Sequence, residues 1–198
     1  MEQLSLIEAR VLGVLIEKES VLPGYYPLTL KAILRGCNQK TERNPIMHVL
    51  ESEVLEALKS LLTMGLTTEH TAKFVTRYAH NLTKELHISN QAVPLLGVLL
   101  LRGPLTPSEI RLVIRTHNFD ASTVRGLLLH MSRDREEALI APLPRQRGAR
   151  EIRWAQLLTG PVETTDRPEM SILELMEMAF DLQRRIRILE EDALVRTT

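Results

Sequence analysis

Residues 93–114, with the sequence VPLLGVLLLRGPLTPSEIRLVI, hold the helix boundaries that decide the fold. The apolar run at their start predicts a buried helix, and Gly103-Pro104 ends it because neither residue suits a helix interior. Thr106-Pro107-Ser108-Glu109 then combines an N-cap threonine, a proline at the first helical position and a glutamate three residues after the cap. We therefore expect two helices joined by a short connection.

A third helix and two strands are predicted in the same half of the chain. Asp120 or Ser122 is the expected N-cap of this helix. Its inward-facing apolar residues are Val124, Leu127, Leu128 and Met131. Leu139-Ile140-Ala141 and Glu151-Ile152-Arg153-Trp154 are predicted to be strands, and Pro144–Gly148 is the predicted turn between them.

The first half repeats this order of elements. Apolar residues at helical spacing predict a first helix over 6–16, and Thr29 is the expected N-cap of a short second one. A polar loop over 37–45 precedes a third helix, whose apolar face lies within residues 54–62. Thr, Val and aromatic residues over 66–78 predict a two-stranded hairpin. Each half thus runs helix, helix, helix, hairpin.

That order predicts tandem winged helix-turn-helix domains in a mainly α protein with small β wings, an α+β fold. The fragment Leu-Gly-Val-Leu occurs at 12–15 and again at 96–99, although the halves otherwise share little sequence. Because three-helix units with short strands also pack as a single domain, one common core is the alternative. The predicted segments are a first winged-helix domain over 1–86, a second over 87–158, a linker over 159–170 and an amphipathic helix over 171–194.

The last predicted helix has apolar residues at alternating spacings of three and four, the a/d pattern of a coiled coil. These residues are Ile172, Leu175, Ala179, Leu182, Ile186 and Leu189. The pattern predicts a homodimer. Because the pattern is short and Ala179 is a small residue at an a position, a helix that folds back on its own domains is the alternative.

The 25 basic and 25 acidic side chains give a formal net charge of zero, but they are unevenly distributed. Residues 1–88 hold ten of each sign. Residues 89–158 hold ten arginines and six acids, whereas residues 159–198 hold five arginines and nine acids. A polyanion could bind the positive segment, and the acidic segment would compete with the polyanion for that site.

The composition also limits the class of protein. An apolar fraction of 44% and a charged fraction of 25% are typical of a soluble globular chain. No apolar run approaches the roughly 20 residues that span a bilayer. The N-terminus lacks the basic start and apolar core of a secretion signal. A single cysteine, Cys37, excludes an internal disulfide, so we expect a cytoplasmic protein with no membrane partner.

The sequence contains no recognisable catalytic constellation. Its six histidines never occur at i, i+4 beside an acid, and the isolated glycines form no phosphate loop. Cys37 lies in no nucleophile motif. We expect a protein that is not an enzyme and needs no cofactor or metal. An apolar pocket with convergent polar groups between the halves, near Asn38-Gln39-Lys40, would favour the enzyme alternative.

Basic residues point to double-stranded DNA as a partner of the second half. In a winged helix-turn-helix the third helix enters the major groove and the wing approaches the backbone or minor groove. Arg125 and Arg133 belong to the predicted third helix and its end. The predicted wing carries Arg145, Arg147, Arg150 and Arg153. We expect the wing arginines to contact phosphate or the minor groove, with the helix arginines nearest the major groove.

The first half has a different charge pattern. Its third helix opens with Glu51, Glu53 and Glu56, and Lys59 is its one basic residue. The three carboxylates oppose contact with phosphates. The alternative function is therefore a protein-interaction scaffold that uses winged-helix surfaces for docking, similar in principle to segregation and condensation protein B. In that alternative the wing arginines are solvated or pair with the acidic C-terminal segment.

The chain resembles the YceH-like family of bacterial proteins of unknown function. The resemblance covers about residues 4–160 and includes the distinctive string Cys37-Asn38-Gln39-Lys40-Thr41. Other family-like strings are Glu8-Ala9-Arg10-Val11, Leu15-Ile16-Glu17-Lys18, Tyr26-Pro27-Leu28-Thr29-Leu30, Arg77-Tyr78, Leu99-Leu100-Leu101-Arg102-Gly103-Pro104 and Leu143-Pro144-Arg145-Gln146. The resemblance implies a tandem winged-helix fold with a variable tail that is often coiled-coil-like.

Around this string, Asn38, Gln39, Lys40 and Arg43 form a candidate family-motif site. The chain departs from the family at Leu50, where the family often has a serine cap, so we expect the third helix of the first half to begin at Ser52.

Overall fold

The computed structural model describes residues 3–72, 74–114, 117–133 and 138–161, which belong to one compact unit spanning residues 1–163. The predicted amphipathic helix over 171–194, its coiled-coil spacing and most of the predicted linker over 159–170 lie outside the described residues.

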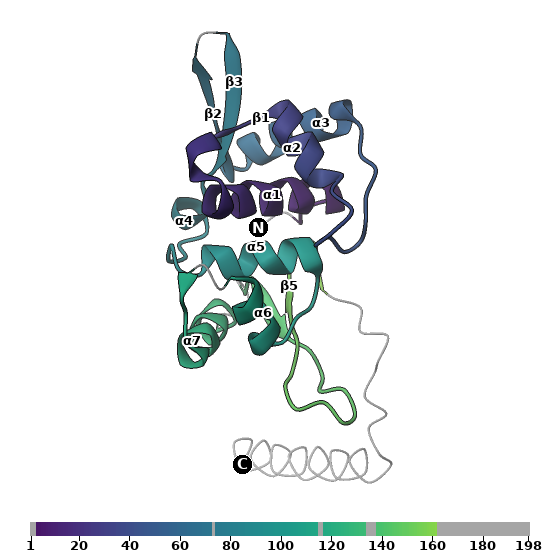
Figure 1. Ribbon diagram of the computed structural model, residues 1–198, viewed down its shortest axis with the longest axis vertical. Helices are drawn as coiled ribbons and strands as arrows, with labels where there is room; N and C mark the ends of the chain where they lie inside the picture. Colours follow the sequence, from purple (N-terminus) through teal and green to yellow (C-terminus); the bar gives the residue numbers. More distant parts are fainter. Residues whose placement is uncertain (1–2, 73, 115–116, 134–137, 162–198) are drawn as a thin grey trace, which may run out of the picture. The chain divides into compact units, whose positions relative to one another are not determined.

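The first module has the element order of a winged helix-turn-helix (Figure 1). Its elements are α1 (Leu6–Val21), the short 3-10 helix η1 (Pro23–Tyr25), β1 (Leu28–Thr29), α2 (Leu30–Cys37), α3 (Glu51–Thr63), β2 (Thr67–Ala72) and β3 (Val75–His80). The three strands form an antiparallel sheet in the order β1-β3-β2, with Leu28 opposite Tyr78. The short helix α4 (Leu82–Glu85) leads into the second module.

The second module repeats this arrangement. Its elements are α5 (Val93–Arg102), α6 (Pro107–Val113), α7 (Ala121–Met131), β4 (Ile140–Pro142) and β5 (Trp154–Gln156). β4 pairs with β5, and Leu105 pairs with Trp154 through two backbone hydrogen bonds of 3.1 and 2.8 Å. Leu105 therefore pairs with β5 as Leu28 pairs with β3 in the first module. The predicted α+β class with winged-helix architecture is confirmed.

N-cap residues fix where the helices begin. The Thr106 hydroxyl accepts from the Glu109 backbone N–H at 3.2 Å, and the Glu109 carboxylate accepts from the Thr106 N–H at 2.8 Å. Thr29 caps α2, as predicted. Asp120, and not Ser122, caps α7. These contacts join residues only three positions apart, which is why the sequence alone predicts them.

The start of α3 differs from its prediction. The helix begins at Glu51 and not at Ser52. The Glu53 carboxylate accepts a hydrogen bond of 2.6 Å from the Leu50 backbone N–H, so one half of a capping box replaces the missing serine. An acidic side chain in the first turn also interacts favourably with the helix dipole.

The second wing also differs from its prediction. Glu151-Ile152-Arg153 is not part of a strand, and β5 begins only at Trp154. The Glu151 carboxylate accepts a hydrogen bond of 3.3 Å from the backbone N–H of Ser108 in α6. This contact holds the backbone at Glu151 in a bend, so residues 143–153 form a loop between the two short strands.

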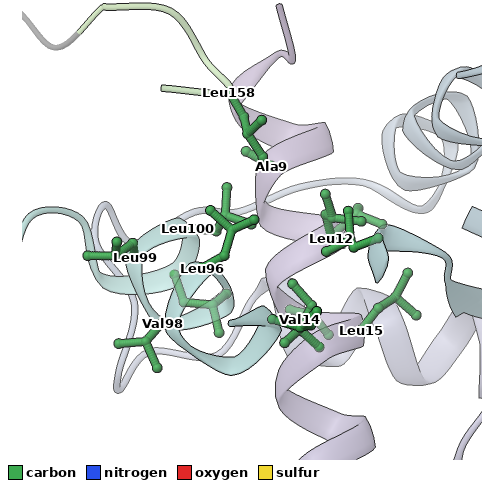
Figure 2. Packing of buried hydrophobic residues seen from close by; sticks show 14 of the residues in the cluster. Ala9, Leu12, Val14, Leu15, Leu96, Val98, Leu99, Leu100 and Leu158 are labelled. Carbon is green, nitrogen blue, oxygen red and sulfur yellow. The ribbon is translucent and has the colours of Figure 1, made fainter. Parts of the chain in front are cut away.

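The two modules share one hydrophobic core, which lies between α1 and α5 (Figure 2). A methyl group added at Gly13 of α1 would lie 2.8 Å from Leu101 Cγ, and one added at Gly97 of α5 would lie 2.5 Å from Ile16 Cγ2. Each helix thus receives a side chain of the other at a glycine, and both glycines come from the repeated Leu-Gly-Val-Leu fragment. The proposed boundary between residues 86 and 87 stays a prediction.

The end of the second module also contacts the start of the first. The Leu4 backbone N–H donates a hydrogen bond of 2.7 Å to the Leu158 carbonyl. Both side chains are buried, and Leu158 lies beside Ala9 of α1 (Figure 2). In the described part of the chain, no helix is both long and apolar enough to cross a membrane.

Substitution of Gly97 tests the contact between α1 and α5. We expect Gly97→Ala to lower the free energy of unfolding by about 1–3 kcal/mol, because the added methyl group displaces Ile16 in a packed core. Urea denaturation measures the change. Gly126→Ala in α7 is the matched control, since a Cβ there meets no atom within 4 Å. The control should gain about 0.5–1 kcal/mol from helix propensity, and a similar gain at Gly97 would contradict the close approach.

Candidate nucleic-acid interface

Helix α7 presents a basic residue on its solvent-facing side. Val124, Leu128 and Met131 are buried against the core, whereas Arg125 is exposed at the flank of this buried stripe. Arg133 is also exposed and lies two residues beyond the end of the helix. The prediction that these two arginines could face a ligand is therefore compatible with their positions.

The predicted wing arginines all lie in the loop over 143–153. The Arg145 guanidinium donates a hydrogen bond of 3.0 Å to the Arg150 carbonyl, which closes the loop on itself. Arg147 and Arg150 are exposed, and Arg153 is half-buried. Arg145 is exposed as well, but its hydrogen bond shapes the loop, whereas Arg147 and Arg150 are exposed with no side-chain hydrogen bond described.

Carboxylates of the second module gather at helix N-termini. Glu109 belongs to the capping box of α6, and Asp120 accepts from the Thr123 N–H at the start of α7. Hydrogen bonds from Thr123 and Ser122 lower the pKa of Asp120 to about 2. Glu151 accepts from the Ser108 N–H, also at the start of α6. Each of the acids that the structure describes after residue 88 thus compensates a positive helix end.

This arrangement leaves the exposed arginines without a described counterion. No ion pair joins any arginine of residues 103–161 to an acid, within the part of that segment that the structure describes. Arg111 on α6 is a further exposed arginine, and sequence reasoning did not select it. The sequence signal for Arg111 was its position in the capped helix, two residues after Glu109.

Helix α3 has the opposite charge pattern in the first module. Glu51 and Glu56 are exposed, and the Glu53 carboxylate bonds to the backbone at the helix start. Lys59 is the one exposed base of this helix. A duplex carries one negative charge per roughly 1.7 Å of its axis, so this helix is poorly suited to the major groove.

The candidate family-motif residues hold a loop in place. The Asn38 side chain donates to the Val49 carbonyl at 2.9 Å and accepts from the Val49 N–H at 2.7 Å, like a strand pair. Gln39 donates to the carbonyl of Thr41. Lys40 is exposed. Asn38 and Gln39 thus shape the loop between α2 and α3.

Two buried arginines complete this loop. The fully buried Arg43 side chain donates from Nε to the Gly36 carbonyl at 3.1 Å. Arg10 donates to the carbonyls of Cys37 and Pro45. Both cations therefore lie at the C-terminal end of α2, where the helix dipole favours positive charge. Sequence analysis did not identify Arg10 as special, although a charged residue inside an otherwise apolar helix was a visible signal.

Glu17 of α1 neutralises the Arg43 guanidinium. Two parallel hydrogen bonds of 3.1 and 2.7 Å join Arg43 to the two oxygens of the Glu17 carboxylate. Burial opposes ionisation of Glu17, but the hydrogen bonds from Arg43 and Lys18 outweigh it and lower the pKa. Burial raises the pKa of the Cys37 thiol to about 12, so this cysteine is unreactive. Asn38, Gln39 and Arg43 have structural partners in this arrangement.

The sequence matches a protein family and several of its relatives. The model of a family described as "Protein of unknown function, DUF480" matches residues 4–149. A UPF0502 protein from Burkholderia ambifaria is 46% identical over 168 residues, which cover 84% of this chain and 71% of that protein. A UPF0502 protein from Burkholderia pseudomallei is 46% identical over 170 residues, covering 85% and 72%. These matches agree with the resemblance to the YceH-like family.

Removal of the Glu17 charge tests whether the motif is structural. We expect Glu17→Gln to lower the free energy of unfolding by about 3 kcal/mol, because it leaves the Arg43 cation buried without a counterion. Chemical denaturation measures the effect. Glu51→Gln, which removes an exposed charge at the start of α3, is the control and should change stability by less than about 1 kcal/mol. Equal stabilities of the two variants would show that the ion pair does not hold the loop.

Proposed function

The chain belongs to the DUF480 family of proteins of unknown function, whose relatives carry the name UPF0502, and we propose that it binds double-stranded DNA through its second winged-helix module. The proposed role is non-enzymatic and lies in the regulation of transcription. The proposed compartment is the reducing cytoplasm, in keeping with the single buried thiol of Cys37.

One observation carries this proposal. The described carboxylates of the second module are held at the starts of α6 and α7, while arginines face solvent from α7 and the loop over 143–153. Acids placed beside helix N-termini are partly compensated by the helix dipoles and cap the helices that carry the module. The exposed arginines are therefore available to phosphates.

The elements suggest a division of roles. α7 corresponds to the recognition helix of a winged helix-turn-helix, so Arg125 would face the major groove and Arg133 its edge. Arg147 and Arg150 would contact phosphate or the minor groove from the loop. Arg145 contributes by holding the loop through Arg150, and Arg153 by its place next to β5.

A homodimer would strengthen such contacts. We propose that residues 171–194 join two chains through their a/d pattern. Linking two weak DNA-binding modules raises the local concentration of the second module once the first has bound. Dimerisation would thus convert weak contacts by single modules into stable binding.

A salt titration of DNA binding tests the proposal. We expect the full chain to bind a mixed-sequence duplex in fluorescence anisotropy, with an affinity that falls as salt rises. Arg147→Ala/Arg150→Ala should weaken binding and reduce the slope of log K against log salt by about 0.9 per lost contact. Lys31→Ala/Arg35→Ala removes two exposed charges from α2 and is the matched control. An unchanged slope in the Arg147/Arg150 variant would contradict the proposal.

A second candidate function is protein docking by the first module. Phe74, at the tip of the β2–β3 hairpin, is fully exposed and has a φ of 68°, and its neighbour Val75 is 46% exposed. A bulky residue rarely adopts a positive φ. This apolar tip, together with the acidic helix α3, is better suited to a protein than to DNA.

Replacement of Phe74 separates the two candidates. A photo-crosslinking residue at position 75 should capture a protein in nuclease-treated lysate, and Phe74→Ser should abolish that capture while DNA affinity stays unchanged. Loss of DNA affinity in Phe74→Ser would instead place the first wing on DNA. Unchanged capture would exclude the tip as the docking point.

A further inference from the structure

A pocket of about 160 Å³ lies between the two modules. Its walls come from the C-terminal half of α1, from α5 and from the end of α6. The apolar part of the lining includes Val21, Pro94, Val98, Val113 and Ile114. A pocket near Asn38-Gln39-Lys40 would favour the enzyme alternative, but none of these three residues lines this pocket. The pocket instead borders the glycine contact that joins α1 to α5, since Ile16 and Gly97 are part of its wall.

The polar part of the lining consists of Glu17, Ser20, Arg102 and His117. A binding pocket usually combines a mainly apolar wall with a few polar groups that orient the ligand. Here the polar groups come from α1, from the last residue of α5 and from the segment that follows α6.

The two oppositely charged residues of the lining, Glu17 and Arg102, differ in how their charges are compensated. Glu17 is held by Arg43 and lies 2.9 Å from the Lys18 ammonium, so its own charge is already compensated. Arg102 forms an ion pair with Glu42, whose side chain is 47% exposed. Arg102 lines the pocket, whereas its partner Glu42 does not. Burial lowers the pKa of Arg102, which indicates that water solvates this guanidinium poorly. A ligand carboxylate can therefore replace the half-exposed Glu42 as the partner of Arg102, whereas the buried Arg43 retains Glu17.

The volume limits the size of the occupant. A cavity of about 150 Å³ holds a molecule of the size of benzene. A carboxylate bound to an arginine forms two parallel charge-assisted hydrogen bonds, which fix its orientation. From these observations we propose that the pocket binds a small aromatic or branched monocarboxylate, whose carboxylate pairs with Arg102 in place of Glu42 and whose apolar body lies against Val98 and Val113. This site goes beyond the proposed function, because it would bind its ligand whether or not DNA is present.

Benzoate is the probe for this site, with neutral benzamide as its isostere. The full chain, labelled with ¹⁵N, is titrated to about 10 mM, a concentration that saturates a site with a millimolar dissociation constant. Amide shifts should saturate and be confined to α1, α5 and the end of α6. Benzamide should bind at least about tenfold more weakly, because it lacks the charge that pairs with Arg102. Equal binding of the two compounds, no saturable shift, or shifts centred elsewhere would overturn the proposal.

Three variants sharpen the test. Arg102→Gln should weaken benzoate binding about tenfold or more, whereas Arg111→Gln removes an exposed arginine outside the pocket and should not change it. Glu42→Gln removes the competing carboxylate and should strengthen binding several-fold. A gain of affinity cannot come from misfolding, so this variant remains decisive if Arg102→Gln unfolds. Unchanged affinity in both Arg102→Gln and Glu42→Gln would exclude the arginine as the anchor.

Discussion

The close approach of α1 and α5 is the constraint on which the rest of the structure depends. Gly13 and Gly97 have no Cβ, and each leaves room for a side chain of the opposite helix. The contact lets the first helix of each module serve as the centre of a shared core. The pocket between the modules is lined on two sides by the same pair of helices. A methyl group at either glycine would therefore disturb the core and the pocket together.

Charges at helix ends form a second common theme. Arg10 and Arg43 bind the carbonyls at the end of α2, and Glu17 neutralises Arg43. In the second module, carboxylates occupy the starts of α6 and α7. The two modules thus use charge differently. The first buries cations to hold a loop, whereas the second fixes its acids at helix starts and presents arginines to solvent.

Local features could be predicted from the sequence, and long-range ones could not. Thr106 and Asp120 mark helix starts because a cap and its partner are three residues apart. The strand predicted at Glu151 was wrong, since its carboxylate bonds to Ser108, a partner distant in the sequence. Arg10 is buried for the same kind of reason, because the carbonyls that bind it belong to another helix and a loop. The wing arginines are close together in the sequence, but only the structure shows that the Arg145 guanidinium bonds to the Arg150 carbonyl and closes the loop.

Native-state hydrogen exchange tests most directly whether the two modules form one folding unit. Leu58 of α3 and Leu128 of α7 are both fully buried, and each reports on a different module. If α1 and α5 unite the modules, the slowest-exchanging amides of both helices should show the same free energy of opening and the same dependence on urea, because both require global unfolding. A smaller free energy and a weaker urea dependence at Leu128 than at Leu58 would show that the second module unfolds by itself and would contradict the shared core.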